Sequence, residues 1–178
     1  DFEVQTFYMK ANPGFGKDQY GIGAIVLHPA ATGSVTLASN DYRDPPMIQP
    51  NLLCATQDVD TTLRGLKMVR AIADTFAAKS AWLGDETLPG KDVTTDEQLI
   101  AFLKKYAVSD FHYVGSCRMG STSDRSAVVD NQLRVHGVER LRVVDASIMP
   151  SLVSGNTNAA SNMIGGHAAD FVLTGRKS

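Results

Sequence analysis

Cysteine is scarce in this sequence: its 178 residues include two, Cys54 and Cys117. They lie far apart and form no CxxC pair, so neither a disulfide framework nor a zinc finger is expected. The net charge is also small, because 17 basic residues stand against 19 acidic ones. The chain therefore has no excess of positive charge that would attract it to phosphate backbones or to anionic lipid. This argues against nucleic acid as a partner.

Long apolar runs are missing as well. No run approaches the roughly 20 residues that a membrane-spanning helix needs, so no transmembrane segment is expected. The first three residues, 1–3, have neither an initiator methionine nor the basic and apolar regions of a signal peptide. We therefore expect the chain to be a segment of a longer polypeptide, and nothing in it indicates a compartment.

The short motifs that mark many enzyme sites are absent too. The sequence contains no GxGxxG, no Walker A loop, no HExxH and no GxSxG. It also has no pair of carboxylates spaced as an obvious acid and base. A phosphate-binding glycine loop is therefore not expected within this chain, and neither is a metal site.

The sequence does contain several short segments with strand character. Residues 4–8 predict a short strand, and 22–27 with 34–39 predict a hairpin, because apolar and β-branched residues dominate these segments. Prolines exclude a helix or a central strand from 40–51. The first part of the chain is therefore expected to contain a small sheet.

Three helices are predicted where apolar residues recur at every third or fourth position. The first covers 58–78, and the second follows Thr95, which forms a capping-box pattern with Gln98. A compact apolar strand is expected over 141–144. The third helix follows the loop 150–155 and continues to the C-terminus.

Together these elements predict an α+β sheet with helices, followed by the closing strand, loop and helix of an α/β domain. The break between them falls near 106–112. We therefore divide the chain into a first portion, 1–109, and a second, 110–178.

His112 is the first candidate for chemistry, in a stretch rich in glycine and serine. A neutral imidazole accepts a proton around neutral pH, so it suits a general base that deprotonates an alcohol. A single histidine is more often structural. On the residues alone, both roles of His112 stay open.

The second candidate is the run 154–158, Ser-Gly-Asn-Thr-Asn, which follows the strand that ends at Asp145. Asn156 and Thr157 are helix-capping residue types, and the start of a helix carries unpaired N–H groups and partial positive charge. A strand, a turn and a helix N-terminus receive anionic or electron-accepting cofactor groups in α/β folds. On spacing alone, a helix cap is the simpler interpretation of Asn156.

These segments, in this order, resemble the C-terminal part of the glucose-methanol-choline (GMC) oxidoreductase family. The similar runs are His112-x-x-Gly115-Ser116-Cys117-Arg118-Met119-Gly120, Val128-Val129-Asp130, 133–138, 141–150 and 154–159. Upstream, 28–37 and 46–53 are similar to the substrate-domain sheet of that family. The resemblance covers nearly the whole chain.

The resemblance implies FAD as cofactor and, as a partner, the N-terminal FAD-binding half of the same protein. It implies that 1–109 is part of a substrate-binding domain and that 110–178 returns to the FAD-binding domain with the catalytic pair. His112 takes the position of the catalytic base, and Asn156 takes the second position of the pair. The implied cofactor contacts fall on Asp145, Ala146, Asn156, Thr157 and Asn158.

The implied activity is oxidation of a small-molecule alcohol, as in choline dehydrogenase-like enzymes. His112 would take the hydroxyl proton while the α-hydrogen leaves as hydride to the flavin. A similarity of 83–90 and 128–138 to the algal fatty-acid photodecarboxylases keeps light-driven decarboxylation of a fatty substrate as an alternative, although that branch lacks the histidine. A non-catalytic family member is a second alternative, and the presence of both His112 and Asn156 counts against it.

Overall fold

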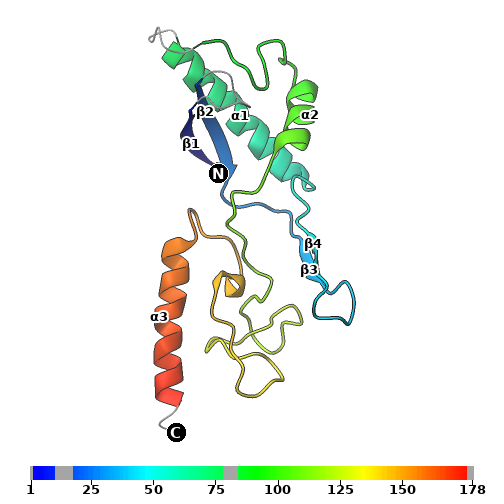
Figure 1. Ribbon diagram of the computed structural model, residues 1–178, viewed down its shortest axis with the longest axis vertical. Coiled ribbons are helices and arrows are strands. Elements are labelled where there is room, and N and C mark those ends of the chain that lie inside the picture. The colour runs from blue at the N-terminus through cyan, green and yellow to red at the C-terminus, as the bar shows by residue number, and fades with distance from the viewer. Residues whose placement is uncertain (1, 11–17, 78–83, 176–178) are drawn as a thin grey trace. The chain divides into compact units, whose positions relative to one another are not determined.

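The structure is a computed structural model that describes residues 2–10, 18–77 and 84–175 (Figure 1). Contacts between Cα atoms divide the chain into two compact units. The first unit joins 1–32 to 51–110, and the second joins 33–50 to 111–178. Each unit has its own cluster of buried apolar side chains.

The first unit consists of two strands and two helices. Strands β1 (Phe2–Met9) and β2 (Gln19–Val26) pair antiparallel along their whole length. Helix α1 (Thr56–Ala77) contacts both strands and also α2 (Asp96–Tyr106) (Figure 1). Gly65 allows α1 to approach the sheet closely, since a Cβ there would lie 2.7 Å from the Cβ of Ala24.

Both predicted helices of this unit are present. The capping box before α2 is confirmed: Thr95 Oγ1 accepts from the N–H of Gln98, whose Oε1 accepts from the N–H of Thr95. Leu99 of α2 is 2% exposed and forms the core of the unit with Leu103 and Leu63. Residue 78, the predicted end of the first helix, lies outside the described residues.

A buried carboxylate ties the start of α1 to the segment after β2. Asp58 is 3% exposed, and its two oxygens accept hydrogen bonds from the backbone N–H groups of Ala30 at 2.7 Å and Ala31 at 2.9 Å. Asp58 lies in the first turn of α1, where the helix dipole stabilises negative charge. These bonds offset the cost of burying the charge.

We expect Asp58→Ala to lower the free energy of unfolding of the first unit by about 2–3 kcal/mol, because two N–H groups lose charge-assisted hydrogen bonds. The shift in urea midpoint, followed by circular dichroism on the full-length protein, measures this loss. Asp60→Ala is the matched control, since Asp60 is exposed on the same helix. Equal midpoints for the two variants would show that the carboxylate does not hold this segment.

The second unit has less regular structure. Strands β3 (Ser34–Thr36) and β4 (Met47–Gln49) pair antiparallel, and the chain later forms the 3-10 helix η1 (Ala146–Ile148) and the long helix α3 (Asn158–Gly175). Its core is a cluster of buried apolar residues. They come from the irregular segment before η1, from η1 with the residue after it, and from α3. These residues are Val129, Leu133, Ile148, Met149, Ile164 and Ala168.

Two predictions about strands are wrong. The hairpin of 22–27 with 34–39 does not form, because β2 pairs with β1 and β3 pairs with β4. The strand over 141–144 is reduced to a single bridge, between Arg142 and Arg134. The N–H of Val143 donates to the carbonyl of Leu133, which lies in an irregular loop. Because that loop is not an extended strand, the hydrogen bonds do not continue into a ladder.

Candidate active site

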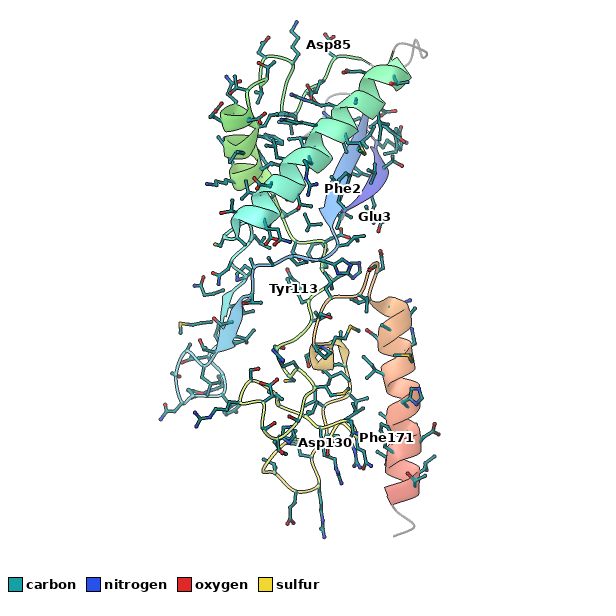
Figure 2. All side chains as sticks on the ribbon, turned by 180° about the vertical axis from the view of Figure 1, so that it is seen from behind. Phe2, Glu3, Asp85, Tyr113, Asp130 and Phe171 are labelled. Carbon is teal, nitrogen blue, oxygen red and sulfur yellow. The ribbon has the colours of Figure 1, made fainter. Side chains whose placement is uncertain are left out.

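His112 lies on a loop whose backbone is fixed against η1. The N–H groups of Cys117 and Met119 donate to carbonyl groups of η1 at 3.0 and 2.8 Å. Between them and His112, Gly115 has a φ of 88°, a left-handed conformation that favours glycine. The loop that carries the histidine is therefore held in place by backbone pairing. Figure 2 labels Tyr113, the residue after His112.

The structure brings His112 to Thr157, a residue 45 positions further along the chain. His112 Nδ1 lies 3.0 Å from Thr157 Oγ1, and the backbone N–H of Thr157 is directed at the same nitrogen with an N···N distance of 3.5 Å. Thr157 is 8% exposed, whereas His112 is half-buried. Both residues belong to the second unit, so the contact lies within one compact body.

Thr157 occupies the N-cap position of α3. Its carbonyl accepts the first intrahelical hydrogen bond, from the N–H of Ser161 at 2.9 Å, and α3 begins at the next residue. Asn156 stands one position earlier and is exposed. The interpretation of Asn156 as the helix cap is therefore wrong.

The remaining residues of the predicted cofactor set lie at the starts of η1 and α3. Asp145 is the N-cap of η1: its Oδ1 accepts from the N–H of Ser147 at 2.8 Å, and the residue is exposed. Ala146 packs against the core of the second unit. Asn158 opens α3 and accepts at Oδ1 from the side chain of Asn162 at 3.2 Å.

The contact between His112 and Thr157 was not predicted from the sequence. The sequence assigns Thr157 to the cofactor and marks it as a helix-capping residue type, but no local pattern links two residues separated by 45 positions. The available signal was chemical: a threonine directly beside Asn156 supplies a hydroxyl next to a predicted member of the catalytic pair.

Within 2–10, 18–77 and 84–175, the structure has no helix able to span a membrane.

Residues 29–165 match the family model described as GMC oxidoreductase. The match covers more than half of the chain. The chain belongs to the GMC oxidoreductase family. Membership confirms the family resemblance and the predicted fold class, which is that of a partial C-terminal region of a GMC oxidoreductase with small sheets and helices.

The relatives of the chain are oxidoreductases. It is 40% identical over 154 residues to the alcohol dehydrogenase [acceptor] of Pseudomonas putida, covering 86% of this chain and 27% of that protein. It is 41% identical over 158 residues to the mitochondrial choline dehydrogenase of Homo sapiens, covering 88% of this chain and 26% of that protein. The chain thus spans about a quarter of the length of these relatives.

A solved structure shares the fold. An FAD-dependent oxidoreductase from Chaetomium thermophilum superposes with a TM-score of 0.76 at 25% identity, over 92% of this chain and 28% of that chain. These likenesses confirm the assignment to GMC-type oxidoreductases. The roles of individual residues, and the division into a substrate-binding portion (1–109) and a return to the FAD-binding domain (110–178), stay predictions.

Proposed function

We propose that this chain is the catalytic C-terminal part of an FAD-dependent enzyme that oxidises a small-molecule alcohol. The observation that carries the proposal is the fixed contact of His112 Nδ1 with Thr157, directly beside Asn156, in a chain of the GMC family. When bound, FAD supplies the electron-accepting chemistry that no amino-acid side chain provides.

The residues at the start of α3 and η1 fit this cofactor. The first turn of α3 offers backbone N–H groups and partial positive charge, which stabilise the negative charge of phosphates or of a reduced ring system. Asp145 presents an exposed carboxylate, which would accept hydrogen bonds from cofactor hydroxyl groups. The residues that would hold FAD are Asp145, Ala146, Asn156, Thr157 and Asn158. The N-terminal half of the same protein supplies the other contacts.

His112 performs the proton step. Its imidazole accepts the proton of the substrate hydroxyl, so the O–H bond breaks and an N–H bond forms. FAD, held by the residues named above, would accept the hydrogen of the alcohol carbon together with its bonding electron pair as a hydride, which leaves a carbonyl double bond on the product. Asn156 donates a hydrogen bond from its amide to the substrate oxygen and stabilises the negative charge that develops there.

The proposal is tested by supplying alcohols and fatty acids to the same flavoprotein. Full-length protein with FAD is mixed anaerobically with choline and with primary alcohols in the dark, and separately with a fatty acid under blue light. We expect an alcohol to bleach the oxidised flavin absorbance in the dark. Light-dependent release of CO₂ without dark bleaching would instead support the photodecarboxylase, and inertness in both arms would support a non-catalytic member.

A further inference from the structure

Phe111, the residue directly before His112, has a strained backbone. Its φ is 63°, in the left-handed region that favours glycine. A residue with a bulky side chain is rare in this region, because its Cβ crowds the following carbonyl oxygen. Conformations of this kind persist only where the surrounding structure holds them, and they gather at active sites and ligand-binding segments. The strain at Phe111 therefore indicates a requirement at this position.

Burial in a core does not account for this conformation. Leu133 has a similar φ of 65°, but its side chain is 3% exposed and belongs to the core of the second unit, so packing offsets the strain there. Phe111, by contrast, is 81% exposed. Phe111 therefore combines a strained backbone with an aromatic ring that the described part of the chain leaves largely exposed.

The exposed ring of Phe111 belongs to the same compact body as the candidate base. The Cα atoms of Phe111 and His112 are about 3.8 Å apart, as for any two consecutive residues. The imidazole of His112 is held at Thr157 within the second unit, which begins at Phe111. In an extended segment, two successive side chains point to opposite faces. The left-handed turn at Phe111 interrupts this alternation, and such an interruption allows two adjacent side chains to contact one small ligand.

The chemistry of a phenyl ring limits what Phe111 can bind. The ring has no hydrogen-bonding group, and it gains most by covering flat apolar surface in a stacked or edge-to-face arrangement. When an alcohol places its hydroxyl at His112, the groups bonded to the same carbon lie within reach of the preceding side chain. An aromatic or unsaturated group on that carbon therefore fits a phenyl ring at this position.

We propose that Phe111 is a specificity-determining residue whose ring packs against a flat apolar group of the substrate. The preferred substrate is then an alcohol with an aromatic or unsaturated group on its hydroxyl-bearing carbon. The left-handed backbone is retained because it presents the ring to this group. The inference rests on the proposed function, since it names the substrate class of the site that contains His112.

Two alcohols that differ in one flat group test the contact in the full-length protein with FAD. Phe111→Leu keeps an apolar side chain but removes the ring, so we expect the KM for benzyl alcohol to rise about 3–10-fold and the KM for ethanol to stay unchanged. Tyr42→Leu is the matched control, because Tyr42 is an exposed aromatic residue of the same unit. This control should keep the wild-type KM for both alcohols.

A glycine at the same position separates substrate binding from a structural role. Glycine adopts the left-handed conformation without crowding, and little buried surface is lost with a ring that is largely exposed. We therefore expect Phe111→Gly to have a urea midpoint at least as high as the wild type, while its KM for benzyl alcohol rises at least as much as in Phe111→Leu. A lower midpoint would show that the ring packs against the rest of the protein, and the proposal would be wrong.

Binding without turnover distinguishes failure of this inference from failure of the proposed function. Cumyl alcohol has a phenyl group but no hydrogen on its alcohol carbon, so it can bind and cannot be oxidised to a carbonyl; tert-butanol is its counterpart without the ring. If calorimetry shows that Phe111→Leu weakens binding of cumyl alcohol alone, and no alcohol reduces the flavin, the ring contact stands and the proposed function fails. If benzyl alcohol reduces the flavin with the same KM in the wild type, Phe111→Leu and Tyr42→Leu, the proposed function stands and Phe111 does not select the substrate.

Discussion

Replacing His112 by glutamine should slow the reduction of the flavin by its alcohol about 10²–10⁴-fold, which is the usual contribution of a positioned general base. The glutamine amide can still hydrogen-bond Thr157, but it cannot take a proton from the substrate. The FAD content should change little, because His112 is not among the residues assigned to the cofactor. The loss is therefore expected in the chemical step and not in cofactor binding.

Anaerobic stopped-flow mixing with the alcohol measures this step. His136→Gln is the matched control: His136 is a half-buried histidine of the same unit, and its Nε2 lies 3.2 Å from the carbonyl of Gly120. We expect this variant to reduce its flavin at the wild-type rate. A His112→Gln variant that is as fast as His136→Gln would remove His112 from the mechanism.

Changing Asn156 to aspartate should have the second-largest effect, a slowing of about 10²–10³-fold, the magnitude seen when one donor to a developing oxyanion is removed. The carboxylate cannot donate, and it also places negative charge beside the substrate oxygen and the cofactor. We expect the reduction potential of the flavin to fall as well, because added negative charge disfavours the reduced, more negative ring.

The structure changes what is expected for stability. Because Thr157, and not Asn156, starts α3, replacing Asn156 should alter the free energy of unfolding by no more than about 0.5 kcal/mol, as for other surface positions. Asn131→Asp introduces the same charge at an exposed position of the same unit, away from the residues assigned to the cofactor, and serves as the control. If Asn156→Asp keeps both the wild-type rate and the wild-type potential, Asn156 is not part of the catalytic pair.

The features that sequence predicted well depend on local chemistry. The helix following Thr95 was predicted because its capping box with Gln98 involves residues three positions apart, and the structure confirms that box. The long helix α1 follows from apolar residues that recur at every third or fourth position. This spacing places them all on one face of a helix. Such signals require no knowledge of distant parts of the chain.

The features that sequence could not supply are long-range. Apolar and β-branched residues identified β2 and β3 as strands, but their partners, β1 and β4, are chosen by the packing of the whole chain. The apolar run 141–144 was expected to be a strand, yet its backbone pairs with an irregular loop. The contact of His112 with Thr157 spans 45 residues and was likewise beyond local patterns.

The roles of His112 and Asn156 came from the family resemblance and stay predictions. The structure adds Thr157 as a partner of His112. It also shows that Asn156 is exposed and lies directly before the residue that starts α3. A helix cap alone would have been an adequate interpretation of Asn156 without that geometry.

The most direct test of alcohol oxidation through His112 is a single-turnover product measurement in the dark. Full-length flavoprotein is mixed without oxygen with an excess of the alcohol that bleaches its flavin, and the carbonyl product is quantified over time. We predict about one carbonyl per flavin for the wild-type protein, and formation about 10²–10⁴-fold slower for His112→Gln. Equal rates in the two proteins, or bleaching without carbonyl product, would contradict the mechanism.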